Sequence, residues 1–234
     1  MWAILKRESR AYYRTPQGFV IIAALFFFSG YFFFTFNLGL NTTDMSKVFS
    51  ELFSVVLFVV PILTMRLFSE DKRLKIDQQL LTSPVTRTGI VLGKFLAAVG
   101  VYFTAIMSTL IAALVMSFFG RPDWPVIIGN FAGLFLLGVT LIAICSFLSS
   151  LTESQVIAAV SSFVVSLFLF VIDHLVYSVK SVFLQELLWN MSFNRRYIPF
   201  TFGVFEIQNV IFFLSVSAMF LCFTIAVLDR KRWS

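Results

Sequence analysis

Charged residues are scarce in this sequence. Asp, Glu, Lys and Arg make up only 13% of its 234 residues, whereas 59% are hydrophobic and the mean hydropathy is +0.92. A water-soluble domain of this length carries far more charge on its surface, so the composition excludes that class and indicates a polytopic membrane protein. About 20 apolar residues cross a bilayer. Six such runs fill the chain and leave no room for a separate soluble catalytic domain.

Cysteine and histidine are also rare. The two cysteines, Cys145 and Cys222, both lie in apolar runs, so we expect no disulfide framework. An intramembrane protease or other membrane hydrolase needs a Ser/His pair, two intramembrane aspartates or a metal motif. One histidine, no Gly-x-Ser-x-Gly motif and a single aspartate near a span, Asp173, make that class a poor interpretation. The first residues also lack the pattern of a cleaved signal peptide.

The apolar runs predict an all-α polytopic membrane protein with six transmembrane helices. They lie at about residues 19–38, 48–68, 90–119, 126–148, 156–177 and 210–228. Residues 1–15 mix cations with aromatic rings, which suits a helix that lies in the membrane interface. Residues 178–209 are less hydrophobic but still aromatic.

Basic residues gather on one side of the predicted spans. They concentrate in the N-terminal segment, in the connection between the second and third spans, and at the C-terminus. The opposite side holds only Lys47, Arg121, Lys180, Arg195 and Arg196. The positive-inside rule therefore places both termini and the second connection in the cytoplasm. The net charge of +6 sets orientation next to the lipid bilayer, and we expect no nucleic-acid partner.

The longest charged connection runs through residues 66–89. Its first part continues the second span as a charged helix, and Ile76, Leu80 and Leu81 then supply a small apolar face. Pro84 stops the helix, because the residue before a proline leaves the helical region. A short amphipathic helix joined to two spans suits transmission of a partner's motion. A solvated loop whose charges only fix topology is the alternative, and spacing alone does not choose between them.

The sequence around Gly89 and Gly93 is not an ATP-binding motif. Three residues separate the two glycines instead of four, and Phe95 stands where a magnesium-binding hydroxyl belongs. Glycines at this spacing predict a close helix packing site. ATP hydrolysis, if it drives this protein, therefore takes place on a separate subunit. We expect no enzyme site and no cofactor in this chain.

Three runs carry a family resemblance: residues 63–70 (LTMRLFSE), 80–85 (LLTSPV) and 90–97 (IVLGKFLA). They closely resemble ABC-2 type transporter permeases, above all the branch associated with bacterial gliding motility. The resemblance extends to residues 8–18 and 147–155 and, weakly, to 200–214. The chain departs from its relatives at Lys75 and Ile76, where they commonly have Gly-Thr, and at Gln78, near which they often carry an acidic residue.

The resemblance implies a single transmembrane domain over residues 1–234 with the type V exporter fold. Residues 1–15 would form an amphipathic elbow helix, residues 66–89 would contain the cytoplasmic coupling helix, and residues 178–209 would form a re-entrant extracytoplasmic gate. The implied partners are an ATPase subunit that binds ATP and magnesium, a second copy or a related permease, and an extracytoplasmic accessory protein. The transport path would follow the dimer interface, mainly between the second and fifth spans, in a bacterial inner membrane.

The resemblance and the charge pattern indicate candidate site residues. The predicted ATPase-coupling residues are Asp77, Gln78, Gln79, Leu80, Leu81, Thr82, Ser83 and Pro84. Further predicted cytoplasmic contacts are Glu70, Arg73 and Glu153, and the predicted gate residues are Asp173, His174, Arg195, Tyr197 and Phe200. A charge buried in lipid is costly, so intramembrane ionisable residues are functional candidates. For Asp173 and His174, interfacial hydrogen bonding is favoured over a proton relay. The alternative to a permease is a non-transporting anchor or scaffold of a motility or secretion complex.

Overall fold

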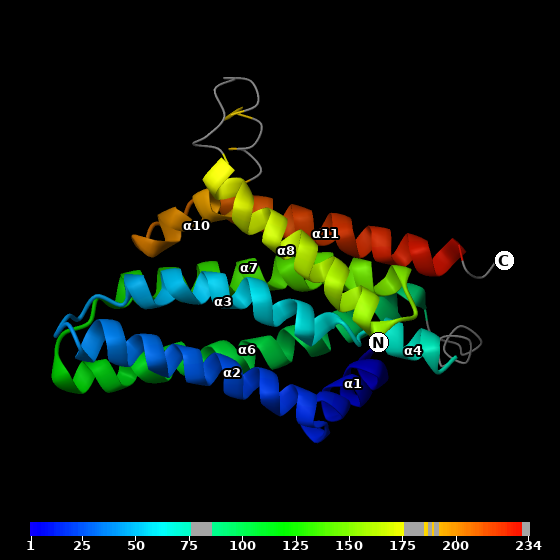
Figure 1. Cartoon of the computed structure of the whole chain (residues 1–234), viewed down its shortest axis with the longest axis horizontal. Helices are drawn as coiled ribbons and strands as arrows, with labels where there is room; N and C mark the ends of the chain where they lie inside the picture. Colours follow the sequence, from blue (N-terminus) through cyan, green and yellow to red (C-terminus); the bar gives the residue numbers. More distant parts are fainter. Residues whose placement is uncertain (76–85, 176–184, 187–188, 190–191, 231–234) are drawn as a thin grey trace.

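The computed structural model describes residues 1–75, 86–175, 185, 186, 189 and 192–230. These residues form helices and contain no strand (Figure 1). In chain order the helices are α1 (Trp2–Arg14), α2 (Pro16–Phe32), the π-helical η1 (Phe33–Leu38), α3 (Ser46–Thr64), α4 (Ser69–Arg73), α6 (Arg87–Phe119), α7 (Trp124–Leu151), α8 (Gln155–Leu175), α10 (Phe193–Thr201) and α11 (Ile207–Arg230).

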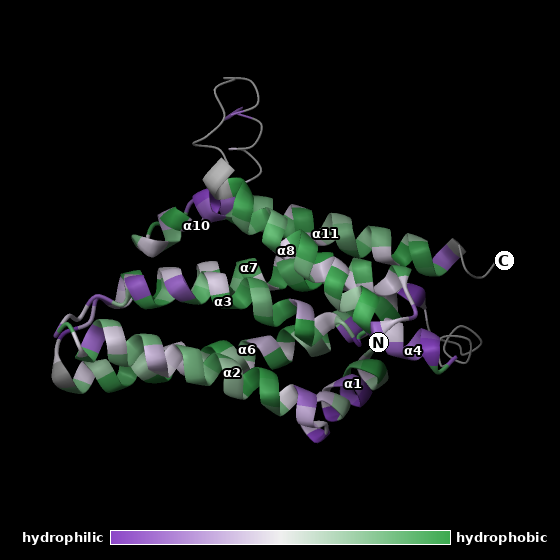
Figure 2. Cartoon of the chain, in the orientation of Figure 1, coloured by the Kyte–Doolittle hydropathy of each residue, from purple (hydrophilic) through white to green (hydrophobic). Residues whose placement is uncertain are grey.

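Six stretches of the described chain are long and apolar enough to cross a membrane. They are Pro16–Leu38, Ser46–Arg73, Arg87–Phe118, Trp124–Leu151, Gln155–Ile172 and Ile207–Asp229. This result confirms the predicted number of spans and their order. Hydrophilic residues gather on α1 and α4 at one end of the bundle and near the connections at the other end, whereas the spans between are mainly hydrophobic (Figure 2).

The third span begins three residues earlier than predicted, at Arg87 instead of residue 90. The cause is a helix cap: the Thr86 hydroxyl accepts a hydrogen bond from the backbone N–H of Gly89 at 3.3 Å. Such caps satisfy one of the unpaired N–H groups of a first helical turn. The first span likewise begins early, at Pro16, because the fixed φ of proline suits the first helical position.

The core of the bundle consists of α3, α6 and α7. In an apolar window of 18 residues within each candidate span, 61%, 50% and 67% of the residues are buried inside the chain, against 22% for α2, 28% for α8 and 17% for α11. Gly138 of α7 allows the closest approach to α6, because a Cβ there would lie 2.1 Å from the ring of Tyr102. The Tyr102 hydroxyl donates a 2.7 Å hydrogen bond to the Leu134 carbonyl, which satisfies a polar group that is fully buried. The three outer helices leave apolar faces on the surface, as lipid-facing helices do.

Three glycines lie next to the N-terminal helix or the turn that follows it. Thr15 is extended between α1 and α2, and a Cβ at Gly18 would lie 2.1 Å from the carbonyl oxygen of Tyr12. The chain can therefore turn this sharply only with glycine at that position. At Gly93 of α6 a Cβ would meet the Ile4 side chain at 3.1 Å, and at Gly89 it would lie 3.6 Å from the Met1 nitrogen. The predicted close packing is confirmed at Gly93, and α1 is the helix that packs there; the atom nearest to a Cβ at Gly89 would be the hydroxyl oxygen of Thr86, at 2.9 Å.

Candidate functional site

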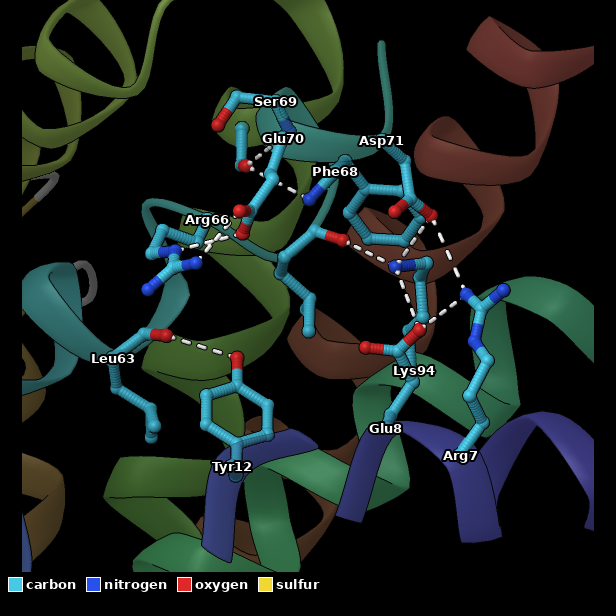
Figure 3. Close-up of polar contacts among 12 residues, drawn as sticks. Arg7, Glu8, Tyr12, Leu63, Arg66, Phe68, Ser69, Glu70, Asp71 and Lys94 are labelled. Carbon is cyan, nitrogen blue, oxygen red and sulfur yellow. Dashed lines mark hydrogen bonds and ion pairs between the residues drawn. The ribbon is translucent and has the colours of Figure 1, made fainter. Parts of the chain in front are cut away.

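A buried lysine links three segments at the end of the bundle where α1 and α4 lie. The side chain of Lys94, on α6, is only 2% exposed. Its Nζ lies 2.8 Å from Oδ2 of Asp71 and 3.2 Å from Oε1 of Glu8, and it donates a 2.7 Å hydrogen bond to the Leu67 carbonyl (Figure 3). The Asp71 contact is an ion pair without hydrogen-bond geometry. A buried ammonium needs such partners, because removing it from water is costly.

Arg7 is a second cation that contacts the same two carboxylates as Lys94. Its Nη2 lies 2.5 Å from Glu8 and 3.7 Å from Asp71, so two cations face two carboxylates. The side chain of Arg7 is 45% exposed, whereas those of Glu8 and Asp71 are 12% and 15% exposed. The outermost cation therefore separates the buried carboxylates from solvent, and the four charges sum to zero.

A second set of polar side chains, centred on Arg66, connects the end of α3 to neighbouring helices. Arg66 donates to both carboxylate oxygens of Glu70, at 2.7 and 2.6 Å, and to the side-chain oxygen of Gln17 at 2.8 Å. A bidentate arginine–carboxylate pair fixes direction as well as distance. Gln17 in turn donates to the Ile62 carbonyl at 2.9 Å. The start of α2 is thus tied to the last turn of α3.

Tyr12 adds a neutral contact to the same turn. Its hydroxyl donates a 3.0 Å hydrogen bond to the Leu63 carbonyl (Figure 3). Burial raises the pKa of Tyr12 well above its usual value, and nearby Glu8 adds to the shift. The phenol therefore keeps its proton and remains a donor throughout the physiological pH range.

The turn between α3 and α4 is anchored to α7. The Ser149 hydroxyl accepts hydrogen bonds from the backbone N–H groups of Phe68 and Ser69, at 3.2 and 3.3 Å, and donates to the Met65 carbonyl at 3.2 Å. Lys72 donates to the carbonyl oxygen of Ser150. The Ser149 side chain therefore forms hydrogen bonds with three backbone groups of the turn that connects α3 to α4.

We call this assembly the polar junction. It consists of Arg7, Glu8, Tyr12, Gln17, Arg66, Glu70, Asp71, Lys72, Lys94, Ser149 and Ser150. Next to it, Arg87 at the start of α6 forms an ion pair with Asp229 near the end of α11. In the sequence, Asp71 and Lys72 of the junction come shortly before residue 75, where the described part of the chain stops, and Lys94 comes shortly after residue 86, where it resumes.

The junction includes only part of the predicted cytoplasmic site. Glu70 belongs to it, Arg73 is exposed at the end of α4, and Glu153 lies exposed in the connection between α7 and α8. The eight predicted coupling residues from Asp77 to Pro84 lie outside the described residues. Sequence reasoning missed the role of Lys94. A signal was present, because a lysine inside an apolar run is an intramembrane charge that calls for a partner.

The predicted gate residues divide between buried and exposed positions at the opposite end. Tyr197 and Phe200 of α10 are 1% and 0% exposed. The Tyr197 hydroxyl donates to the Phe49 carbonyl at 3.4 Å, and a Cβ at Gly133 would lie 2.8 Å from the Phe200 side chain. Arg195 is exposed, with its guanidinium 4.7 Å from the centre of the Trp189 ring. Asp173 and His174 end α8, and their side chains lie outside the described part of the structure.

An open pocket of about 730 Å³ lies beside α10. Among its lining residues are two cations, Lys47 and Arg121, and two acids, Asp44 and Asp123. Asp44 accepts a hydrogen bond from the backbone N–H of Ser46 at 2.9 Å. Within the described residues, none of these four side chains forms an ion pair, and no cluster of His, Cys, Asp and Glu is suited to hold a metal.

The chain matches a known protein family. Residues 1–195 match the family described as ABC-2 type transporter, a range that includes α1 to α8 and the whole polar junction. No curated protein matches the chain. The match agrees with the family resemblance of the three sequence runs and with the six candidate spans.

Proposed function

The chain belongs to the ABC-2 type transporter family, and from this premise we propose that it is the permease subunit of a bacterial exporter. The permease carries no ATPase site of its own. ATP and magnesium act on a separate nucleotide-binding subunit, and two permeases, either two copies or this chain with a related one, form the transport path. Both termini and the polar junction face the cytoplasm of the inner membrane.

Within the family we assign the chain to the gliding-motility-associated branch with the type V fold. In this assignment α1 is the elbow helix, residues 66–89 hold the coupling helix, and residues 178–209 form the outer gate. The three sequence runs quoted above support it. The sharp turn at Gly18 and the packing of Gly93 on Ile4 also suit a helix that lies across the ends of the spans.

The observation that carries the proposal is the polar junction, whose residues Asp71 and Lys94 come before and after residues 76–85 in the sequence. Lys94 joins α6 to Glu8 of α1 and to Asp71 of α4. Because these charges are buried, separating one from the others leaves an unpaired charge, which is far more costly than moving them as a group. A partner that moves the coupling segment would therefore move the attached spans.

The alternative is a non-transporting anchor of a motility or secretion complex. Its support is the strongly apolar composition of the predicted spans in the sequence. ATP-dependent movement of any cargo into or out of vesicles that contain this chain and its ATPase would eliminate the anchor.

The test of ATPase coupling replaces Leu80 and Leu81 with aspartate in the complete complex, recovered from membranes by pull-down on this chain. The two charges would remove the apolar face of the predicted coupling helix. We expect the ATPase subunit to be lost from the complex, together with the ATP hydrolysis that the permease stimulates.

The matched control is Leu40→Asp, because Leu40 is 56% exposed at the opposite end of the bundle. This variant should assemble with the ATPase as the wild type does. Wild-type assembly and hydrolysis in the Leu80/Leu81 variant would overturn the proposed coupling.

A further inference from the structure

The open pocket beside α10 lies between three segments that are far apart in the sequence. Its lining comes from residues 43–50, which lead into α3 and begin it, from residues 121–126, which connect α6 to α7, and from residues 194–202, in and just after α10. Its volume is about 730 Å³, and sites for small ligands commonly enclose about 300–1,000 Å³. The pocket therefore has the size of a ligand site.

Hydrogen bonds hold the walls of the pocket in place. The Thr201 carbonyl at the end of α10 accepts from the Ser46 hydroxyl at 3.4 Å and from the side-chain amide of Asn130, on α7, at 3.3 Å. The side-chain amide of Asn37, which is only 1% exposed, donates to the Asp44 carbonyl at 3.1 Å. The lining segments are thus fixed before a ligand arrives, which lowers the cost of binding one.

The connection between α6 and α7 packs closely against both other segments. A Cβ at Gly120 would lie 2.7 Å from the Thr43 side chain, and a Cβ at Gly203 would lie 3.2 Å from the Pro125 carbonyl. Gly203 also has a φ of +72°, which residues other than glycine seldom adopt. The pocket is therefore a constant feature of how these three segments meet.

Both signs of charge line the pocket without pairing. Lys47 and Arg121 are its cations, and Asp44 and Asp123 are its acids. All four residues are exposed, and none of them forms an ion pair with any described residue. The four charges sum to zero but do not neutralise one another by contact. A ligand with one negative and one positive group would find two opposite charges for each group.

Apolar side chains of α10 border the charged lining. Ile198 and Phe202 line the same pocket and are 44% and 72% exposed. The pocket also lies at the ends of candidate spans, because the second begins at Ser46 and the fourth at Trp124. The ends of spans lie where the headgroup region of a bilayer meets its hydrocarbon core. Charged and apolar lining at this depth match the two parts of a phospholipid.

We propose that the pocket binds a zwitterionic phospholipid with a primary ammonium group, such as phosphatidylethanolamine, from the surrounding bilayer. The phosphate contacts Lys47 and Arg121, because guanidinium and ammonium donors form charge-assisted hydrogen bonds with phosphate oxygens. The ammonium group of the lipid donates to the carboxylates of Asp44 and Asp123. The two apolar side chains of α10 contact the acyl chains. This site lies apart from the polar junction and does not depend on the proposed transport function.

The chemistry of the pocket predicts which lipids it rejects. Phosphatidylcholine carries the same charges, but its quaternary ammonium has no N–H to donate to the two acids. Phosphatidylglycerol has the phosphate but no cationic group. Each lacks hydrogen bonds between charged groups that phosphatidylethanolamine forms, so we expect both to bind about tenfold more weakly or worse.

The test titrates the full-length chain, purified in detergent, with these three lipids, all with the same acyl chains. Native mass spectrometry measures the bound fraction. We expect phosphatidylethanolamine to bind about tenfold more tightly than the other two, and equal affinities would overturn the proposal. Glycerophosphoethanolamine, which has the same headgroup without acyl chains, should bind at least about tenfold more weakly than the lipid. Equal binding of that soluble compound would overturn the assignment to a lipid.

The first variant removes the partners of the phosphate. Lys47→Gln with Arg121→Gln should weaken binding of phosphatidylethanolamine about tenfold or more. The matched control is Lys6→Gln with Arg10→Gln, which removes two exposed cations of α1 at the other end of the bundle (Figure 1). The control should bind as the wild type does. An equal loss in the control, or no loss in the pocket variant, would overturn the proposal.

The second variant changes lipid preference, which a loss of local structure would not do. Asp44→Asn with Asp123→Asn removes the partners of the ammonium group, and asparagine at residue 44 keeps an acceptor for the backbone N–H of Ser46. We expect phosphatidylglycerol to bind this variant at least as well as phosphatidylethanolamine does. An unchanged preference, or an equal loss of binding for all three lipids, would overturn the proposal.

Discussion

The two ends of the helix bundle place charge in opposite ways. At the junction end, the side chains of Lys94, Glu8 and Asp71 are at most 15% exposed. A carboxylate oxygen of Glu8 and one of Asp71 each lie within 3.2 Å of the Lys94 Nζ. At the pocket end, Lys47, Arg121 and Asp123 are exposed and form no ion pair among the described residues. Charges of the first kind fix helices relative to one another, and charges of the second kind leave a surface open to other molecules.

The difference follows from the cost of taking charge out of water. A buried ion pair recovers its desolvation cost only when geometry and hydrogen bonds are both favourable, so such a pair requires one arrangement of the elements that carry it. Exposed charges impose no such requirement. Under the proposed function, the junction end is therefore the part of the chain that we expect to move as a unit.

Among the tests of this difference between the two ends, we expect the largest effect on stability from Lys94→Met. The variant keeps an unbranched side chain but leaves Glu8 and Asp71 without their buried cation, so we expect a loss of about 3–5 kcal/mol in the free energy of unfolding. The matched change at the pocket end, Lys47→Met, should cost less than about 0.5 kcal/mol. Unfolding of both proteins in detergent micelles measures the difference, and equal losses would contradict the contrast between the ends.

An intermediate effect is expected from Tyr12→Phe. The change deletes the hydroxyl that donates to Leu63 at 3.0 Å and leaves that carbonyl with one partner fewer. We expect a loss of about 1 kcal/mol. Tyr13→Phe is the control, because Tyr13 is 40% exposed and its hydroxyl has one hydrogen-bond contact among the described residues, with the Thr104 hydroxyl at 3.1 Å. A Tyr13 variant less stable than the Tyr12 variant would argue against α1 being anchored through its buried face.

The smallest effect is expected from Glu70→Gln. The ion pair of Glu70 with Arg66 is bidentate but partly exposed, with side chains 25% and 31% exposed. Solvent screening limits its contribution to about 1 kcal/mol or less, and added salt should reduce it further. Asp123→Asn at the pocket end should show neither the loss nor the salt dependence. If the loss of unfolding free energy in Glu70→Gln is the same at low and high salt, the Glu70–Arg66 pair is not screened by solvent. It would then resemble the buried ion pairs of Lys94, which would contradict this prediction.

Much of the architecture follows from local sequence patterns. Six apolar runs predict six spans, and the spacing of Gly89 and Gly93 predicts close packing; the six candidate spans and the packing at Gly93 are confirmed. Helix starts were less accurate, because a single capping hydroxyl on Thr86 moved one of them. Coupling by Asp77 to Pro84 and gating by Asp173 and His174 stay predictions.

The polar junction could be predicted only in part. The run of charges after residue 69 marks the segment, and Lys94 inside an apolar run signals a buried partner. Its partners lie 86 and 23 residues away in the sequence, at Glu8 and Asp71, and no local pattern connects them. The pairing depends on how α1 folds back at Gly18 onto α6, which is a property of the packed helices.

The central claim is that the junction transmits a partner's motion as one unit. Its most direct test is a double-mutant cycle with Asp71→Asn and Lys94→Met in the reconstituted complex, with cargo moved per ATP hydrolysed as the readout. We predict that each single variant lowers this ratio and that the double variant is no worse than Lys94→Met alone, because the two charges act together. Ratios unchanged in the single variants, or losses that simply multiply in the double variant, would contradict the account.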